Sequence, residues 1–474
     1  MTARILQRLF EQKNIPADAK KILDDFDLLV QRAMPANSRQ LVALPKQIRG
    51  LSHQMTDERG SRRLGYMNDT AQLSAYARYF VWWNLVRLTR LFCNLDFSFL
   101  RDGDACLDIG SGPLTLPCAL WLSRPDLREK KLVWTVMDIS HGALSLGEEI
   151  YLSVVATTGG EPWKINKVKG PLGTATRQKA RFVSCANMFN EVIQSQGEMK
   201  DFRARPLSRR ADRNATEESR AFNGAAENDA FLAKKHSSAL FNYLDISKGN
   251  RSAILLVEPG VPKSARFVSF MRDAFIERGF KICAPCPHQG ECPMDGRRAG
   301  QKGAGGKWCN FAFETEGAPK KLLALSEKAG LAKERAVMSF VMAECGRPQS
   351  EKKDERSCGK KMEARKKACA SPRSPSALLR IASDIIRVPA KEPGGKTRIG
   401  HYACSDRGLV LALSSDGRRV YSGDLLELPA ACEGLESVSQ KNGRRDFGRA
   451  NGFDRRTSAR EIRDSKTGAL VVEI

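Results

Sequence analysis

Cysteine is the residue type whose spacing says most about chemistry in this chain. The stretch from Cys283 to Cys292 reads CAPCPHQGEC, so three cysteines alternate with proline, histidine and glycine. Proline would serve no purpose in the middle of an ordinary buried strand, whereas the turns it favours allow thiolates to converge on one point. Four converging thiolates suit an iron–sulfur cluster or zinc. The sequence therefore predicts a metal centre in this region.

The identity of the four ligands stays open at this level. Local spacing favours one set, with His288 as an alternative ligand for zinc: Cys283, Cys286, Cys292 and Cys309. A second set exchanges Cys283 for the distant Cys404. Cys283 lies in a strand-like run, where a small buried thiol is the simpler interpretation.

A glycine-containing turn indicates a second kind of chemistry. The run CLDIGSGP, residues 106–113, places two glycines directly after an expected strand and before an expected helix. Glycine allows a ligand to approach the backbone amides of such a turn. Asp138 ends the next expected strand, where a carboxylate can accept both hydroxyls of a ribose. The predicted cofactor-binding residues are Asp108, Gly110, Ser111, Gly112, Pro113 and Asp138.

The pattern around this turn resembles motifs of S-adenosylmethionine-dependent methyltransferases. Leu114 and Leu116 stand where a dinucleotide site would have further glycines, which disfavours a dinucleotide. The run CANMFNE, residues 185–191, faces the same expected cleft, and it contains no Asn-Pro-Pro-aromatic box for holding an exocyclic amine. The candidate catalytic residues are Asn187, Asn190 and Glu191, with helix capping as their alternative role.

The elements that position these residues alternate between strand and helix from about residue 100. Short apolar runs at 105–109, 132–137, 182–186 and 254–257 read as strands separated by helical segments. We therefore expect an α/β fold with a parallel, doubly wound sheet. The resemblance makes this a class I S-adenosylmethionine-dependent methyltransferase-like sheet, with an N-terminal helical region and a small C-terminal β extension. In the helical region, Tyr79, Phe80, Trp82 and Trp83 are expected to pack in the core.

Changes of composition divide the chain into five expected parts. An Arg-rich stretch at 196–236 has little apolar periodicity and reads as a disordered insertion. In the β extension, 399–413 and 419–426 read as two strands joined by a turn at 414–417. The expected parts are an N-terminal helical region (1–100), a methyltransferase-like domain (101–345) with the cysteine motif at 283–309, a basic linker (346–378), a β extension (379–430) and a basic tail (431–474).

Bulk composition limits the partners. The 474 residues contain 78 Lys and Arg against 54 Asp and Glu, a net charge of +24, which favours a polyanion such as nucleic acid. No run of about 18 apolar residues occurs, so no membrane span is expected. The odd number of cysteines, thirteen, and the lack of a secretory signal indicate reduced thiols.

Several of these motifs together resemble a known family, the methyltransferase-like assembly proteins of the small ribosomal subunit, which include a mitochondrial protein and its bacterial relatives. The resemblance covers most of the chain outside the low-complexity stretches and the tail. The residues that carry it are Leu44–Ile48 with Leu51 and Ser52, Tyr66, Ala75 and Tyr76, Asp108–Pro113, Ala284–His288 with Cys292 and Pro293, Trp308 and Cys309, and Cys404.

The resemblance implies S-adenosylmethionine as cofactor and a 4Fe-4S cluster held by Cys286, Cys292, Cys309 and Cys404. It also implies action in maturation of the small ribosomal subunit, with its rRNA as partner. We expect a monomer off the ribosome, in the bacterial cytoplasm or, in a eukaryote, in mitochondria. Three functions remain: an assembly factor that binds S-adenosylmethionine, an active rRNA methyltransferase, and a non-enzymatic RNA-binding protein stabilised by zinc.

Overall fold

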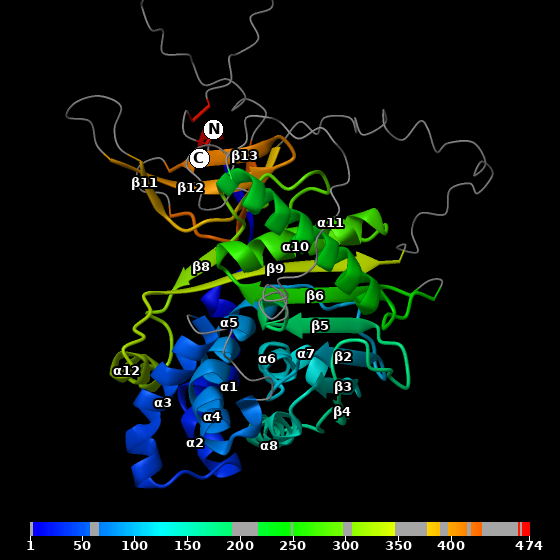
Figure 1. Ribbon diagram of the computed structural model, residues 1–474, viewed down its shortest axis with the longest axis vertical. Coiled ribbons are helices and arrows are strands. Elements are labelled where there is room, and N and C mark those ends of the chain that lie inside the picture. The colour runs from blue at the N-terminus through cyan, green and yellow to red at the C-terminus, as the bar shows by residue number, and fades with distance from the viewer. Residues whose placement is uncertain are drawn as a thin grey trace, which may run out of the picture.

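The computed structural model describes residues 3–56, 66–191, 217–247, 250–296, 306–346, 377–388, 397–414, 419–428, 463–464 and 467–474. Within these stretches the strands form two sheets, one of eight strands and one of seven. We call them the central sheet and the outer sheet. Figure 1 shows the central sheet across the middle of the molecule, the N-terminal helices (blue) below it and the outer sheet (orange) above it. No helix in these stretches is both long and apolar enough to cross a membrane.

The central sheet has the strand order β4-β3-β2-β5-β6-β9-β7, with β8 also pairing with β9. The pairs from β4 to β6 are parallel, and β9 is antiparallel to β6, β7 and β8. Its strands are β2 (Ala105–Ile109), β3 (Val133–Asp138), β4 (Lys164–Lys169), β5 (Phe182–Ala186), β6 (Ser252–Pro259), β7 (Lys281–Ala284), β8 (Phe311–Glu314) and β9 (Arg335–Cys345). The winding direction reverses between β2 and β5, and ligands bind outside such a reversal.

Both faces of the central sheet are buried, which explains its near-continuous apolar strands. In β2, Cys106 packs into one hydrophobic cluster, whereas Leu107 and Ile109 pack into another on the opposite face. The first cluster contains α5, α6 and α8, and the second contains α10 and α11. The helices around the sheet are α6 (Thr115–Ser123), α7 (Pro125–Arg128), α8 (His141–Thr158), α10 (Glu217–Phe241), α11 (Pro262–Glu277) and α12 (Lys320–Lys328). The predicted doubly wound α/β fold is confirmed.

The N-terminal helices pack through their aromatic side chains. Trp82 donates from Nε1 to the carbonyl of Leu23 at 2.7 Å, and Trp83 donates to Oγ of Ser326 at 3.1 Å. Both rings are buried with Tyr79, so the expected core role is confirmed for these three residues. The elements are α1 (Ala17–Asp24), α2 (Phe26–Ala33), α3 (Ser38–Thr56), α4 (Thr70–Ala75) and α5 (Trp82–Phe92), with 3-10 turns at Gln12–Asn14 and Tyr66–Asn68 and a π-helical turn at Tyr76–Val81.

The outer sheet joins both ends of the described chain. Its order is β1-β14-β10-β12-β13-β15, with β11 pairing β12. β1 pairs antiparallel with β14, and β15 pairs parallel with β13. Its strands are β1 (Arg4–Arg8), β10 (Ala377–Ile381), β11 (Ile386–Val388), β12 (Arg398–Ser405), β13 (Gly408–Leu413), β14 (Asp424–Leu428) and β15 (Leu470–Glu473). The sequence predicted neither β1, within the expected helical region, nor β15, within the expected tail.

The predicted strand pair in the β extension is wrong. The run 399–413 is two strands, β12 and β13, which pair with each other around a turn at Ser405–Gly408. Gly408 has a φ of +106°, a conformation that favours glycine and lets the chain reverse there. β14 pairs with β1 and β10 instead of with β13. Of the predicted 414–417 turn, residues 415–417 lie outside the described residues.

The expected insertion differs from the structure in its second half. Residues 217–241 form α10, which packs on α11. Asp229 and Arg266 form a buried ion pair between the two helices, with an Nη2–Oδ2 distance of 2.6 Å. Residues 196–216 of the predicted insertion, most of the predicted linker (347–376) and most of the predicted tail (431–462) lie outside the described residues.

Candidate functional site

The glycine turn forms the link between β2 and α6. Gly110 and Gly112 have φ values of +68° and +49°. The amides of Gly110 and Ser111 donate to the carbonyl of Met137 at 2.8 and 3.0 Å, which ties the turn to the end of β3. A Cβ at position 110 would lie 2.7 Å from Cβ of Met188. Glycine is therefore required at 110 for both its conformation and its space.

Leu114 occupies the position of the third glycine in many such turns. It is fully buried and has a φ of +53°, a left-handed conformation that costs a non-glycine residue about 1–2 kcal/mol. Gly147 of α8 provides the room, because a Cβ there would lie 2.7 Å from Cδ1 of Leu114 and 2.4 Å from the carbonyl carbon of Pro113. The close approach of α8 thus supports the turn from behind.

Asp138 holds the turn in place from the end of β3. Its Oδ2 accepts from the amide of Gly112 at 2.9 Å and its Oδ1 from the amide of Ser140 at 2.8 Å. Burial raises the pKa of this carboxyl above its usual range. Each carboxylate oxygen has a second lone pair, so Asp138 can still accept from a ligand hydroxyl.

Asp108 is the more deeply buried of the two acids. Its Oδ1 accepts from Oγ of Ser184 at 2.7 Å, and the residue is only 1% exposed. Burial raises its pKa to about 7, with the Asp138 carboxylate adding to the increase. A positively charged ligand group nearby would favour the ionised form.

A cavity of about 500 Å³ opens beside the turn, a volume typical of small-ligand sites. The structure brings the six predicted cofactor residues together in its wall: Asp108, Gly110, Ser111, Gly112, Pro113 and Asp138. Met67, Tyr76, Asn84 and Leu88 of the N-terminal helices close another part of the wall. The cavity lies at the carboxyl ends of β2, β3 and β5, where the winding of the sheet reverses.

The turn after β5 carries the three catalytic candidates, and the structure separates them. Asn187 and Glu191 line the cavity, and Asn187 has a left-handed φ of +59°. Asn190 does not line it; its Oδ1 accepts from Oγ of Ser264 at 3.0 Å. Two of the three candidates can therefore contact a ligand directly.

Glu258 fixes this turn from the end of β6. Its two carboxylate oxygens accept from the amides of Phe189 and Asn190 at 2.8 and 3.0 Å. The carboxyl is 1% exposed, and burial raises its pKa to about 8. Glu258 therefore positions the neighbours of Asn187 and does not line the cavity itself.

Helix α10 contributes cavity residues that the sequence reasoning missed, namely Lys235, His236 and Ala239. The His236 ring packs against Phe189 at a centroid distance of 5.4 Å, and burial lowers its pKa to about 4. A signal was present in the sequence, because the buried residues Asp229, Leu232, Ala233, His236, Ser237 and Leu240 follow helical spacing. The Arg-rich composition of the segment before it hid that signal.

Four of the cysteines, which we call the cysteine centre, lie near the junction of the two sheets. Cys286 and Cys292 follow β7, Cys309 precedes β8, and Cys404 lies in β12. Burial raises the pKa of each of these four thiols, and the nearby thiols raise it further for Cys292, Cys309 and Cys404. These shifts show that the structure brings the four thiols within electrostatic reach of one another.

Cys283 and His288, the other two candidate ligands, differ in burial. Cys283 is exposed, and its charged neighbours are Glu344, Lys281 and Arg251. Both ring nitrogens of His288 are buried without a hydrogen-bond partner among the described residues. Within the part of the chain that the structure describes, no three histidine, cysteine or acidic side chains are arranged as ligands of a single metal ion.

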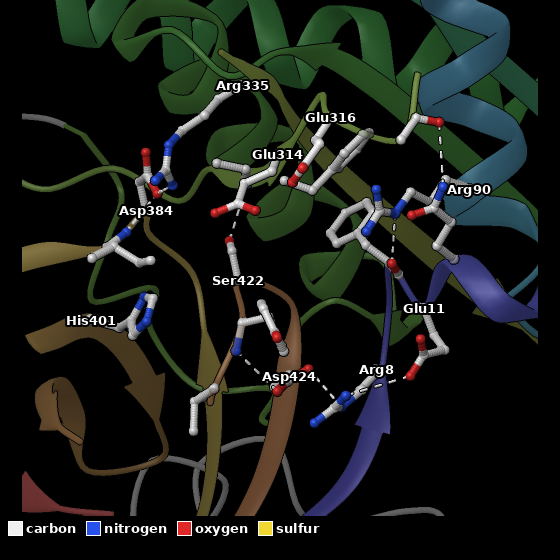
Figure 2. A pocket seen from close by; sticks show the side chains of 18 residues that line it. Arg8, Glu11, Arg90, Glu314, Glu316, Arg335, Asp384, His401, Ser422 and Asp424 are labelled. Carbon is white, nitrogen blue, oxygen red and sulfur yellow. Dashed lines mark hydrogen bonds and ion pairs between the residues drawn. The ribbon is translucent and has the colours of Figure 1, made fainter. Parts of the chain in front are cut away.

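A second cavity, of about 480 Å³, lies at the seam of the two sheets. Figure 2 shows its charged side chains directed at one another. Arg8 lies 3.5 Å from Glu11 and 3.7 Å from Asp424, and Arg335 pairs with Asp384. The Arg335–Asp384 pair links β9 of the central sheet to the loop between β10 and β11. This cavity thus contains cross-links between the sheets.

Comparison with known proteins identifies a family for part of the chain. Residues 238–372 match the family model described as mitochondrial small ribosomal subunit Rsm22. This range includes Cys286, Cys292 and Cys309. The match to this family model confirms the resemblance inferred from the sequence. No curated protein matches the chain.

Solved structures give remote likenesses. Magnesium protoporphyrin IX methyltransferase from Synechocystis PCC 6803 with bound S-adenosylhomocysteine is 10% identical, with 69% of this chain and 99% of that chain covered and a TM-score of 0.30. A S-adenosylmethionine-dependent methyltransferase from Geobacter sulfurreducens is 11% identical, with coverages of 56% and 90% and a TM-score of 0.28. YjhP from E. coli is 11% identical, with coverages of 62% and 100% and a TM-score of 0.27.

We assign the fold from the chain's own strand order because these scores are low. The strands β4, β3, β2, β5 and β6 are parallel, and the winding direction reverses between β2 and β5. The antiparallel strand β9 lies between β6 and β7. This order is typical of class I S-adenosylmethionine-dependent methyltransferases. The predicted fold class is therefore confirmed.

Proposed function

We propose that this chain is an assembly factor of the small ribosomal subunit that binds S-adenosylmethionine and a 4Fe-4S cluster. The match of residues 238–372 to the Rsm22 family model supports the association with the small subunit. The observation that supports binding of S-adenosylmethionine is the cavity of about 500 Å³ at the glycine turn. All six predicted cofactor residues line it. Its position outside the carboxyl ends of β2, β3 and β5 is where this class of sheet binds nucleosides.

Different cavity residues contact different parts of the cofactor in this proposal. Asp138 accepts hydroxyl groups of a ribose while it holds Gly112, and the close backbone at Gly110 and Gly112 admits the ligand to the turn. Asp108, with a pKa of about 7, favours a cationic group nearby when it is ionised. The bound cofactor supplies an electrophilic methyl group, and the apolar wall at Tyr76 and Leu88 limits water around it.

The cysteine centre supports the cluster. Thiolates are the ligands that iron–sulfur clusters require, and the four thiols interact with one another. A cluster binds each thiolate through a different iron, so its ligands stand farther apart than those of one zinc ion. The role of the cluster is to join the outer sheet, through Cys404, to the central sheet.

Docking on the small subunit and its rRNA is supported by charge. The net charge of +24 favours contact with phosphates, and such contacts weaken as salt concentration rises. The family name associates its members with the mitochondrial small ribosomal subunit. We therefore place this chain with small-subunit particles, as a monomer when it is free of them.

Methyl transfer to rRNA is the second candidate function. It is favoured by Asn187 and Glu191, which line the cavity beside the glycine turn. In this proposal they orient the acceptor nucleotide, since both side chains can accept hydrogen bonds from an exocyclic amine. Transfer of a labelled methyl group to immature small subunits, lost in the Asn187→Ala variant but not in Asn190→Ala, would support it.

Calorimetry with S-adenosylhomocysteine tests cofactor binding. We expect Asp138→Asn to weaken binding at least about tenfold, because hydrogen bonds to a charged group contribute about 1.5–3 kcal/mol. Asp126→Asn is the matched control, because Asp126 is an exposed carboxylate paired with Arg124 away from the cavity. No measurable binding to the unmodified chain, or equal binding by both variants, would contradict the proposal.

Metal analysis after anaerobic purification tests the cluster. We expect about four irons per chain, with most of the iron lost in Cys404→Ser and retained in Cys283→Ser, a control that removes the exposed thiol. Zinc in place of iron would favour the zinc-stabilised alternative.

Sedimentation with small subunits at rising salt tests docking on the small subunit. Association that is absent or insensitive to salt would count against docking through phosphate contacts.

A further inference from the structure

Two buried arginines contact the cysteine centre from opposite sides. Arg272 of α11 is 3% exposed and donates from Nε to Sγ of Cys286 at 3.2 Å. Its Nη2 donates to the carbonyls of His288 and Gly290 at 3.1 and 2.7 Å. One guanidinium thus binds both a thiol and the backbone of the cysteine loop.

Arg380 of β10 is also 3% exposed and reaches the centre from the outer sheet. It lies opposite Cys404 in the β10–β12 register. Its Nε donates to the carbonyl of Pro285 at 2.7 Å, its Nη1 to the carbonyl of Gly423 at 2.6 Å and its Nη2 to Oε1 of Gln7 at 2.8 Å. Arg380 therefore links the cysteine loop to β1 and to the start of β14.

Acidic side chains do not fully balance these two charges. Arg272 pairs with Asp273 at 2.8 Å, a carboxylate that is one-third exposed. The carboxylate of Asp424 acts electrostatically on Arg380, and Asp424 also pairs with Arg8. Buried charges are costly unless they are paired. The other groups beside the two guanidiniums are thiols: Sγ of Cys286 lies 3.2 Å from Nε of Arg272, and Cys404 stands opposite Arg380 in the strand register.

We propose that Arg272 and Arg380 are the counter-ions of the four-thiolate centre, and that Arg380 makes the pairing of β1 and β14 depend on that centre being occupied. This inference rests on the proposed cluster. An oxidised cluster with four thiolates carries a net negative charge of about two, which two guanidiniums balance. Without that charge, Arg380 remains a buried cation at the junction of β1, β10 and β14.

The test compares Arg272→Gln and Arg380→Gln with Arg266→Gln in the full chain. Arg266 is the matched control, since it is a buried guanidinium on the same helix as Arg272 but is paired with Asp229. We expect loss of iron to a chelator to become about 10- to 100-fold faster in the first two variants, as for other groups that support metal ligands. The control should lose iron at the rate of the unmodified chain.

The reduction potential separates charge compensation from a purely structural role. Removing a positive charge should lower the potential of the cluster that remains bound, and a tenfold change in the reduction equilibrium corresponds to about 59 mV for one electron. Arg380→Lys keeps the positive charge but loses the planar guanidinium fork. Its reduction potential should therefore be close to that of the unmodified chain, whereas it should still lose iron faster than the unmodified chain. In Arg380→Gln, hydrogen exchange at β1 should also become faster.

The outcomes separate the two proposals. An unmodified chain that binds no cluster would overturn the proposed function and this inference with it. A chain that binds the cluster, but whose Arg272 and Arg380 variants match Arg266→Gln in potential and retention, would overturn the inference alone. If a glutamine variant fails to fold, Arg272→Lys and Arg380→Lys still decide the question. Retention of iron in both lysine variants at the rate of the unmodified chain would count against it.

Discussion

Replacing Gly147 by alanine is the sharpest test of how the glycine turn is supported. Gly147 lies in α8, and an added Cβ would stand 2.4 Å from the carbonyl carbon of Pro113 and 2.7 Å from the amide nitrogen of Leu114. Both neighbours are backbone atoms of the turn, so they cannot move aside like a flexible side chain. Ordinary contact begins at about 3.4 Å, so the turn or the helix must shift by roughly 1 Å.

The expected magnitude is a difference of two effects. Alanine stabilises a helix interior by about 1 kcal/mol relative to glycine, whereas overpacking a close-packed site costs about 1–3 kcal/mol, and occasionally more. We expect a net loss of up to roughly 2 kcal/mol in the free energy of unfolding. Displacement of the turn should also weaken binding of S-adenosylhomocysteine at least about tenfold, since small misplacements at a site are costly.

Gly142→Ala is the matched control in the same helix. A Cβ at 142 would be 3.8 Å from its nearest neighbours, which is ordinary contact. Thermal unfolding and calorimetry on both variants measure the effect. Equal stability and equal affinity in the two variants would refute the close packing of α8 on the turn.

Two further predictions concern buried charges. Because the folded chain keeps a proton on Glu258 between the ordinary pKa of 4.5 and about 8 while the unfolded chain releases it, the free energy of unfolding should fall as pH rises through this window. Glu258→Gln should reduce that slope in denaturant titrations from pH 5 to 8, whereas Glu277→Gln, at an exposed site, should not; an unchanged slope in Glu258→Gln would contradict the assignment. Asp229→Ala removes the carboxylate that pairs with the buried Arg266, so it should cost about 3–5 kcal/mol and make α10 sensitive to proteolysis. Adding Arg266→Met should recover most of that loss, and the absence of recovery would show that the ion pair is not the cause.

The cofactor cavity was predictable because local rules converge there. Gly110 and Gly112 adopt the positive φ values that glycine favours, and Asp138 lies at a strand end on the same edge of the sheet. A strand, a glycine turn and an acidic strand end suffice to bring such residues together in a parallel sheet. Sequence reasoning could not show that Gly147 compensates for Leu114, because that contact joins separate elements.

Elements stabilised by distant partners were not predictable. β1 is five residues long, and its partner β14 lies near the other end of the chain, so no local pattern indicates the pairing. The turn between β12 and β13, Ser405–Gly408, is short, and the apolar residues on both sides of it made 399–413 read as one strand. Likewise α10 has a helical pattern of buried residues, but an Arg-rich stretch precedes it.

The cysteine centre shows the same limit. Local spacing favoured Cys283, Cys286, Cys292 and Cys309 as one set, with Cys404 in place of Cys283 as the alternative. The position of Cys404 depends on the β10–β12 pairing of the outer sheet, so spacing could not decide between the two sets. The exposure of Cys283 could not be read from its strand-like surroundings.

The pairing of Arg4 with Glu427 has a consequence for biosynthesis. β1 leaves the ribosome long before β14, the strand that completes its hydrogen bonds, and Cys404 is also translated before β14. Contacts between residues so far apart form slowly, and until then β1 is an open edge that other chains can add to. The pairing of β1 with β14 should therefore form late, and the edge of β1 is exposed to aggregation until it does.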